Sequence, residues 1–313
     1  MSTPGREREQ EPEAPTTPAV DPSPPRAQAA HTARVLALQR TVGNRAVNEL
    51  IAGGGAPEHR ALALARKPIQ IKKGMSEQRI AGKGSYGWTA AFQVEYVGNE
   101  CILTVKVRLK PKAGVTQAEI DTVKADTEAA FRRYWDEKFY LDDTKTSERF
   151  FLRVKLEWVT TGQHVTVKLV KGKGRANQTT WYTEGLPETR AHELSHTLGL
   201  LDEYIDPTAV KRKTATSPGV FQDHSLMGNY YAEGTGVAEV KLRHGQAIAK
   251  LIGKASKRTF TVGYTGPYQG ERLVRWRGIR DAAKAAGDTA AETAATAEVN
   301  AIESDMLIPM LTP

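Results

Sequence analysis

Two histidines and a glutamate stand at a spacing that suits metal-assisted hydrolysis. His192 and His196 are four residues apart and flank Glu193. On a helix, residues four apart share a face, so both imidazoles can be directed at one point. Imidazole is a common ligand of Zn²⁺, and a carboxylate between the two can take a proton from water that the metal activates. The spacing therefore predicts a helix that binds one zinc ion through His192 and His196, with Glu193 as general base.

A third ligand is expected directly after this helix. Gly199 can end the helix in a left-handed turn, which a residue without Cβ adopts at low cost. The chain then returns toward the metal and brings Asp202 to it as a third ligand. If the turn is one residue longer, Glu203 becomes the ligand instead. Three protein ligands leave a fourth position for water, as in catalytic rather than structural zinc sites.

The pattern from His192 to Asp202, H-E-x-x-H-x-x-G-x-x-D, resembles the motif of the metzincin clan of zinc metallopeptidases. That clan also has a tight turn with a methionine beneath the metal, and the resemblance assigns this role to Met227. Most of the clan has a histidine where this chain has Asp202, and a carboxylate ligand is expected to weaken the pull of zinc on water. The resemblance implies a zinc metalloendopeptidase that acts on a protein or peptide substrate.

A different class of zincins takes its third ligand from a glutamate on a downstream helix. Glu233 or Glu239 would supply that ligand here. The helix-breaking Gly199 at its place in the motif favours Asp202 over both.

Peptide hydrolysis also needs a donor for the developing oxyanion and a surface for the substrate. Tyr230, Tyr231 and His244 are candidates for this contact, with Tyr204 behind them, although His244 also fits a surface histidine. In the clan the substrate cleft follows an edge strand before the zinc helix. The segment 177–182, which carries Trp181, stands in that place and would contact an extended peptide.

Composition excludes several classes of protein. The chain has 313 residues, a formal net charge of +8 and a single cysteine, so an intramolecular disulfide is impossible. We expect no membrane span, because no run of about eighteen apolar residues occurs. The basic residues are scattered, which favours a solvated surface, and no motif indicates a specific nucleic acid. We expect a monomer that is made in the cytoplasm without a Sec signal.

The alternation of apolar residues predicts an α+β fold. Strands are expected over 91–97 and 101–109, joined by a hairpin, and again over 150–158 and 165–169. A capping box of Thr116 and Glu119 begins a long helix that runs to about residue 139. Pro187 and Glu188 suit the first turn of the zinc helix, and a further helix is expected over 236–252. The order is that of a zincin catalytic domain, with a mixed twisted sheet, a long backing helix and an active-site helix.

Composition also divides the chain into segments. The first is rich in Pro, Glu, Thr and Ala and is expected to be disordered, while the second has apolar residues at helical spacing. The predicted segments are a disordered arm (1–32), a short amphipathic helix (33–52), a linker (53–68), a zinc metallopeptidase domain (69–265) and an Ala-rich helical tail (266–313).

The amphipathic helix carries a second resemblance. Leu38 to Leu50 reads L-Q-R-x-x-G-N-x-A-V-x-x-L and is similar to the N-terminal segment of proteins encoded with bacterial extracellular contractile injection systems. This resemblance implies a toxin or effector that is loaded in the bacterial cytoplasm through contacts of residues 33–52 with tube or sheath components and injected into a target cell. The alternative is a structural or loading component of such a machine whose zinc site is vestigial.

Overall fold

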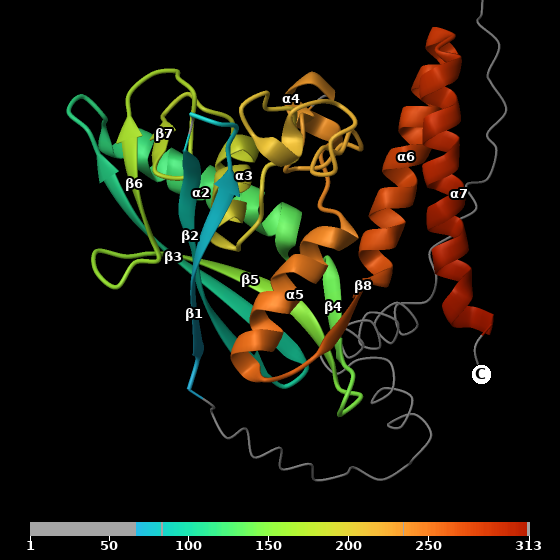
Figure 1. Cartoon of the computed structure of the whole chain (residues 1–313), viewed down its shortest axis with the longest axis horizontal. Helices are drawn as coiled ribbons and strands as arrows, with labels where there is room; N and C mark the ends of the chain where they lie inside the picture. Colours follow the sequence, from blue (N-terminus) through green and yellow to red (C-terminus); the bar gives the residue numbers. More distant parts are fainter. Residues whose placement is uncertain (1–66, 83, 234, 312–313) are drawn as a thin grey trace, which may run out of the picture. The chain divides into compact units, whose positions relative to one another are not determined.

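The computed structural model describes residues 67–82, 84–233 and 235–311, and the ribbon in Figure 1 follows these ranges. The predicted arm, the amphipathic helix of residues 33–52 and nearly all of the linker lie outside the described residues. What is described is a mixed α+β structure in which one curled sheet carries the helices that hold the histidines.

The sheet is mixed, as expected. The segments in which apolar residues alternate form strands of this sheet. Its main order is β1-β2-β3-β5-β4-β8, with β6 beside β3 and β7 beside β6. β3 runs parallel to β5 and β6, while β1, β4 and β8 pair antiparallel with their neighbours. The bounds are β1 (Ile69–Gln78), β2 (Ser85–Val97), β3 (Glu100–Pro111), β4 (Phe139–Asp143), β5 (Arg149–Trp158), β6 (Val165–Val170), β7 (Thr180–Tyr182) and β8 (Phe260–Tyr264).

The predicted hairpin between β2 and β3 is confirmed. Val97 lies opposite Glu100 and Gln93 opposite Thr104. Along β3 the alternate side chains face the core, and four of them are fully buried: Cys101, Leu103, Val105 and Val107. Burial of one face of the strand fixes this register, because a slip of one residue would expose all of them.

Beyond this hairpin the sheet divides. The backbone groups of successive strand residues point to opposite edges. Val107 accepts a hydrogen bond from Val159 on the β5 side, whereas Lys106 bonds to His164 through both its N–H and its C=O. The edge of β3 that pairs with β2 over residues 100–104 therefore pairs with β6 over residues 107–111. The first half of β2 pairs with β1 and diverges from β6 and β7. The fork between them lies beside His192, Glu193 and His196.

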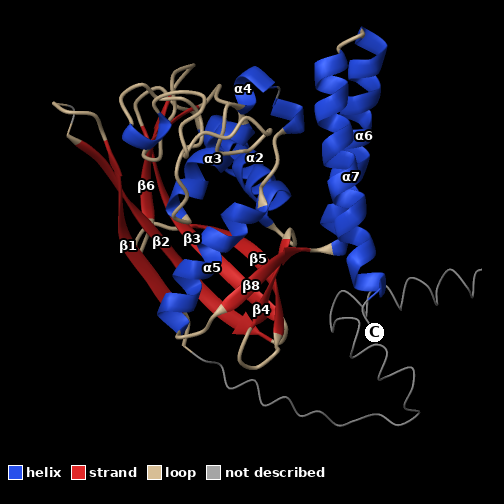
Figure 2. Ribbon diagram, turned by 45° about the vertical axis from the view of Figure 1, so that its right-hand side comes forward, coloured by secondary structure: helices blue, strands red, loops and turns tan. Residues whose placement is uncertain are grey.

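Three helices pack against the sheet (Figure 2). The long helix α2 (Gln117–Trp135) lies on β5, α3 (Pro187–Thr197) packs on α2 and β2, and α5 (Leu242–Ser256) contacts β8. The predicted capping box is present, since the Thr116 N–H donates to Glu119 Oε2 and the Glu119 N–H to Thr116 Oγ1. The long loop after α3 contains the short helices η1 (Val210–Arg212), α4 (Tyr230–Glu233) and η2 (Thr235–Val237).

Two helix boundaries differ from the prediction. The long helix ends at Trp135 rather than near residue 139, because Phe139 begins β4. The helix predicted over 236–252 begins only at Leu242 and continues to Ser256. Residues 236 and 237 of its predicted first turn belong instead to the short helix η2, and beyond them Glu239 forms a bridge with Ser225.

The C-terminal segment forms a helical hairpin. α6 (Gly266–Ala286) and α7 (Thr289–Leu311) lie side by side in both views (Figures 1 and 2). Gly287 ends α6 at a φ of 71°, a left-handed conformation that glycine adopts without strain. A small apolar cluster of Trp276, Ala295, Val299 and Ile302 holds the two helices together. None of the described helices is both long and apolar enough to cross a bilayer.

Candidate metal centre

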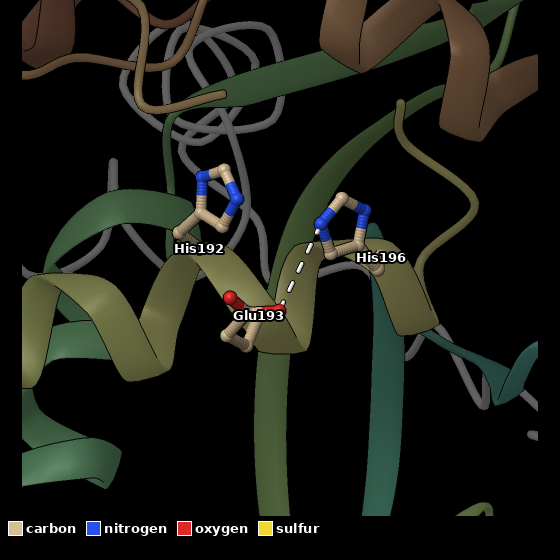
Figure 3. Close-up of side chains that lie close together, drawn as sticks. All are labelled: His192, Glu193 and His196. Carbon is tan, nitrogen blue, oxygen red and sulfur yellow. Dashed lines mark ion pairs between the residues drawn. The ribbon is translucent and has the colours of Figure 1, made fainter. Parts of the chain in front are cut away.

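The helix α3 presents the predicted cluster. It begins with Pro187 and carries Glu188 in its first turn, where an acidic group suits the helix dipole. His192, Glu193 and His196 project from it and are all buried (Figure 3). One potential ligand atom from each of the three lies within 4.8 Å of the others. A buried His-Glu-His group that could hold a metal ion is therefore present.

The helix α3 ends at Thr197, and the left-handed turn predicted at Gly199 follows it. Gly199 has a φ of 92°, and its N–H donates to the His196 carbonyl at 2.9 Å. A Cβ at this position would lie 2.5 Å from Leu251 Cδ1, which is too close for any side chain. The position therefore needs glycine for its backbone and for its packing against α5. The turn reverses the chain toward the imidazoles.

Both imidazoles are held by backbone carbonyls. His192 Nδ1 lies 2.8 Å from the Leu226 carbonyl oxygen, and His196 Nδ1 lies 2.9 Å from that of Leu200. A carbonyl only accepts, so each Nδ1 carries the proton that it donates. In a neutral imidazole this leaves Nε2 with its lone pair, which is the form that ligates a metal.

Asp202 lies against both Nε2 atoms. Asp202 Oδ1 lies 3.1 Å from His192 Nε2 and 3.3 Å from His196 Nε2. Ligands at about 2.0–2.1 Å around a tetrahedral zinc ion stand roughly 3.4 Å apart, and both of these distances are close to that value. The phenol of Tyr204 donates to Asp202 Oδ2 at 3.2 Å and so holds the carboxylate in this orientation.

The charges of the cluster interact strongly. Burial disfavours the imidazolium form, but the hydrogen bond that His192 donates to Asp202 and the charge of Glu193 outweigh it and raise the pKa of His192 to about 9. Burial acts against the Asp202 carboxylate too, yet its contacts with both imidazoles hold its pKa well below the usual range. Burial raises the pKa of Glu193, which the nearby imidazoles only partly offset.

Glu203 points away from the imidazoles. Its carboxylate accepts two hydrogen bonds from Arg243, each at 2.7 Å, and lies 3.1 Å from His244 Nε2. Burial raises its pKa, but these two partners outweigh burial and lower the pKa to about 2. Glu203 thus stays ionised in an ion pair of its own, and the structure brings Asp202, not Glu203, to the histidines.

His244 belongs to this ion pair and not to the cluster. It is 2% exposed, so it is not a surface histidine. Its Nδ1 accepts from the Lys241 N–H at 3.0 Å, which leaves the proton on Nε2 to donate toward Glu203. The histidine therefore holds Glu203 and is not a donor to substrate.

A tight turn follows at residues 225–228. The Gly228 N–H donates to the Ser225 carbonyl at 2.9 Å, and Met227 is fully buried. The carbonyl of Leu226 in this turn is the one that fixes His192. A buried methionine thus stands in a turn that contacts the cluster directly.

A cavity of about 1070 Å³ opens over the cluster. His192, Glu193, His196 and Asp202 line it on one side. The opposite side is formed where the sheet forks, by residues 86–89 of β2, 164–166 at the start of β6 and the loop 174–179. The Trp88 indole N–H donates to the His196 carbonyl at 3.1 Å and so ties β2 to the end of α3.

The predicted substrate contacts divide into two groups. Tyr230 and Tyr231 line the cavity with their rings stacked 4.7 Å apart. Both phenols bond to Thr189, but Tyr231 is 59% exposed and Tyr230 only 3%. Trp181 was expected beside the substrate and is instead fully buried against the ring of Trp158.

The expected edge strand is also shorter than predicted. Asn177 and Thr180 exchange backbone hydrogen bonds in a tight turn, and only 180–182 are strand. The side of the cavity is provided instead by residues 86–89 in the first half of β2, which the sequence did not single out. The stretch Ser-Tyr-Gly-Trp at its start has no clear alternation, so no local signal marked it.

Of the two glutamates considered as downstream ligands, Glu239 does not join the cluster. Glu239 is 1% exposed, and its carboxylate is surrounded by Lys241, Arg272 and Arg275. The side chain of Glu233 lies outside the described part of the structure.

Comparisons with known proteins returned nothing. No protein-family model, no curated protein and no solved structure matches the chain. Function therefore has to be argued from the site.

Proposed function

We propose that this protein is a zinc-dependent endopeptidase. The observation that carries the proposal is the convergence of His192 Nε2, His196 Nε2 and Asp202 Oδ1 beside Glu193 at the floor of a large cavity. Structural zinc sites are closed by four protein ligands, whereas three ligands facing a cavity suit catalysis. The volume exceeds the roughly 300–1,000 Å³ of small-molecule clefts and has room for several residues of a peptide.

His192, His196 and Asp202 would hold the metal, and their hydrogen bonds already orient the ligand atoms. Zinc, when bound, supplies a Lewis acid that polarises a carbonyl and increases the acidity of water. Cobalt or manganese can occupy similar donor sets, but two imidazoles and a carboxylate in a tetrahedral arrangement favour zinc.

Glu193 is the proton carrier. Its carboxylate is 8% exposed, lines the cavity and lies 3.9 Å from His196 Nε2. Because burial raises its pKa, the ionised carboxylate is a stronger base than one in water. It takes the proton of the attacking water as the C–O bond forms and delivers it to the nitrogen as the C–N bond breaks. The phenol of Tyr231, which is exposed in the same cavity, is the best-placed donor to the oxyanion.

Zinc content and peptide turnover test this function. The wild-type chain should bind one zinc ion after metal-free purification and reconstitution, and His192→Ala with His196→Ala should abolish binding. Incubation with a proteome should create new N-termini, and Glu193→Gln should prevent their formation while zinc is retained. Zinc binding without cleavage by the wild type would contradict the proposal and favour the vestigial component.

We further propose that the enzyme is the cargo of a contractile injection system. This rests on the similarity of Leu38 to Leu50 alone, and these residues lie outside the described structure. Deletion of residues 1–60 should leave zinc binding intact and prevent loading into the particle. Equal loading of the shortened and complete chains would contradict the assignment.

A further inference from the structure

A buried carboxylate joins the C-terminal hairpin to the body of the protein. The side chain of Glu239 is completely buried. Its Oε1 accepts from Lys241 Nζ at 2.5 Å and from the Trp276 indole at 3.3 Å, and its Oε2 accepts from Arg275 at 2.9 Å. Arg272 lies 3.3–3.4 Å from both oxygens. Burial of such a charge is costly unless it is paired, and three of its four partners come from α6.

The backbone of the same residue leads to the metal centre. The Glu239 carbonyl accepts from the Leu226 N–H at 2.9 Å, and its own N–H donates to the His224 carbonyl at 2.8 Å. The Leu226 carbonyl in turn accepts the Nδ1 proton of His192 at 2.8 Å. A continuous series of hydrogen bonds therefore runs from α6 through Glu239 and Leu226 to a metal ligand.

We propose that Glu239 is a positioning residue of the metal centre and that α6 controls the orientation of His192 through it. The inference rests on the proposed function, because it concerns the same metal site. The bond to Leu226 keeps the proton on Nδ1 and thereby directs the lone pair of His192 Nε2 toward Asp202. Without its α6 partners, Glu239 is a poorly paired buried charge, so the segment that carries it shifts and Leu226 moves with it.

The hairpin has other contacts that do not follow this route. Lys138 Nζ lies 2.6 Å from Glu271 Oε2 and joins α6 to the body of the protein near β4. Arg277 pairs with Glu303 at 2.6 Å within the hairpin. Neither pair touches Glu239. Variants of these two pairs therefore show whether a loss of zinc affinity comes from the proposed route or from a general loosening of the hairpin.

The test is the dissociation constant of zinc, measured by competition with a chelating dye on the full chain. Replacement of Arg272 and Arg275 by Met should weaken zinc binding by ~10-fold or more, the size of effect that groups behind the ligands have. The matched variants Glu271→Gln and Arg277→Met should stay within about twofold of the wild type, because neither pair contacts Glu239. An unchanged dissociation constant in the Arg272 and Arg275 variant overturns the proposal, and so does an equal loss in Glu271→Gln.

A second measurement uses the wild type and does not depend on how the variants fold. Coupling between two sites is reciprocal, so zinc must stabilise the docking of α6 as much as α6 supports zinc. Saturation with zinc should slow amide hydrogen exchange in α6 and in residues 224–228. If saturation with zinc leaves the rate of amide hydrogen exchange in α6 unchanged, the proposal is overturned. Both measurements need metal binding and not turnover, so a protein that binds zinc but cleaves nothing contradicts only the proposed function.

Discussion

Among the clusters of buried charge in the described residues, the candidate metal centre faces a cavity, whereas the cluster around Glu239 does not. The imidazoles of the metal centre donate from Nδ1 to carbonyls and direct Nε2 toward Asp202, under open volume. The carboxylate of Glu239 is enclosed by cations and an indole, and Glu239 does not line that cavity. Both clusters bury ionisable groups, yet their partners differ.

The comparison teaches that burial of charge does not by itself mark a functional site. In the second cluster both carboxylate oxygens of Glu239 accept hydrogen bonds from other residues of the protein, so these ion pairs hold α6 in place. In the first, the atoms that converge are of the kinds that ligate metals, and they line an open cavity. Convergent donor atoms beside a cavity are therefore the stronger indication of function.

The same change in the two clusters should have opposite consequences. Glu193→Gln should lower peptide turnover by ~10²–10⁴-fold, the usual contribution of a general base, with zinc content unchanged. It should leave the free energy of unfolding equal or higher, because it removes a carboxylate whose pKa is raised by burial. Zinc analysis, a peptide assay and urea unfolding measure the three quantities. A large loss of stability would contradict this expectation, because it would show that the Glu193 carboxylate stabilises the fold as that of Glu239 does.

The assignment of the third ligand comes next. Asp202→Ala should weaken zinc binding by more than ~100-fold, the upper limit for groups behind the ligands. Asp202→His should retain zinc, because an imidazole can replace the carboxylate. Glu203→Gln should keep zinc but lower the free energy of unfolding, since it breaks the pair with Arg243. The opposite result for zinc, with Glu203 essential and Asp202 not, would make Glu203 the ligand.

The enclosed cluster should fail in acid. Burial raises the pKa of Glu239, but Lys241 and Arg272 outweigh it, so its folded pKa lies below the ordinary value. Its contribution to stability is therefore complete above the unfolded pKa of about 4.3 and is lost as the pH falls through the folded pKa. Glu239→Gln should lower the free energy of unfolding by ~3–5 kcal/mol at pH 7. The difference from wild type should shrink below about pH 4; urea unfolding across pH measures it, and a constant difference contradicts this account.

The turn after α3 should show the smallest effect. Gly199→Ala should cost about 2 kcal/mol, because the left-handed backbone strains a residue with Cβ and the methyl group meets Leu251. Zinc affinity should fall with stability, since this turn brings Asp202 to the imidazoles. In α6, Gly278→Ala has open space around it and should leave stability equal or higher. Thermal unfolding and zinc titration of both variants give the comparison.

Part of this structure could be predicted from the sequence because the rules involved are local. The spacing of His192 and His196 with Gly199 behind them predicted a helix, its end and a zinc site, and the helix, its end and a buried group that could hold a metal ion are present. The alternation around Cys101 and the capping box at Thr116 predicted a hairpin and a helix start in the same way. In each instance the signal lies within a few residues of the feature.

The fork of the sheet had no such signal. It depends on β6 taking the edge of β3 that β2 leaves, and these strands are far apart along the chain. The cavity walls at 86–89 and 164–166 follow from that pairing, and so does the burial of Trp181. Which strand lies beside which is decided by packing of the whole sheet.

By itself, the sequence determined which residue types could hold a metal and act as a base, because their order and spacing set the face of one helix. Only the tertiary structure showed that Asp202, and not Glu203, lies beside the imidazoles of α3. The two are neighbours in the chain, and the difference arises because Arg243 and His244 of α5 reach one carboxylate while the imidazoles of α3 reach the other. Likewise, Glu239 supports α6 because the fold brings to it Arg272, Arg275 and Trp276, which lie more than thirty residues further along the chain. The role of a buried carboxylate follows from the cations that the fold brings to it.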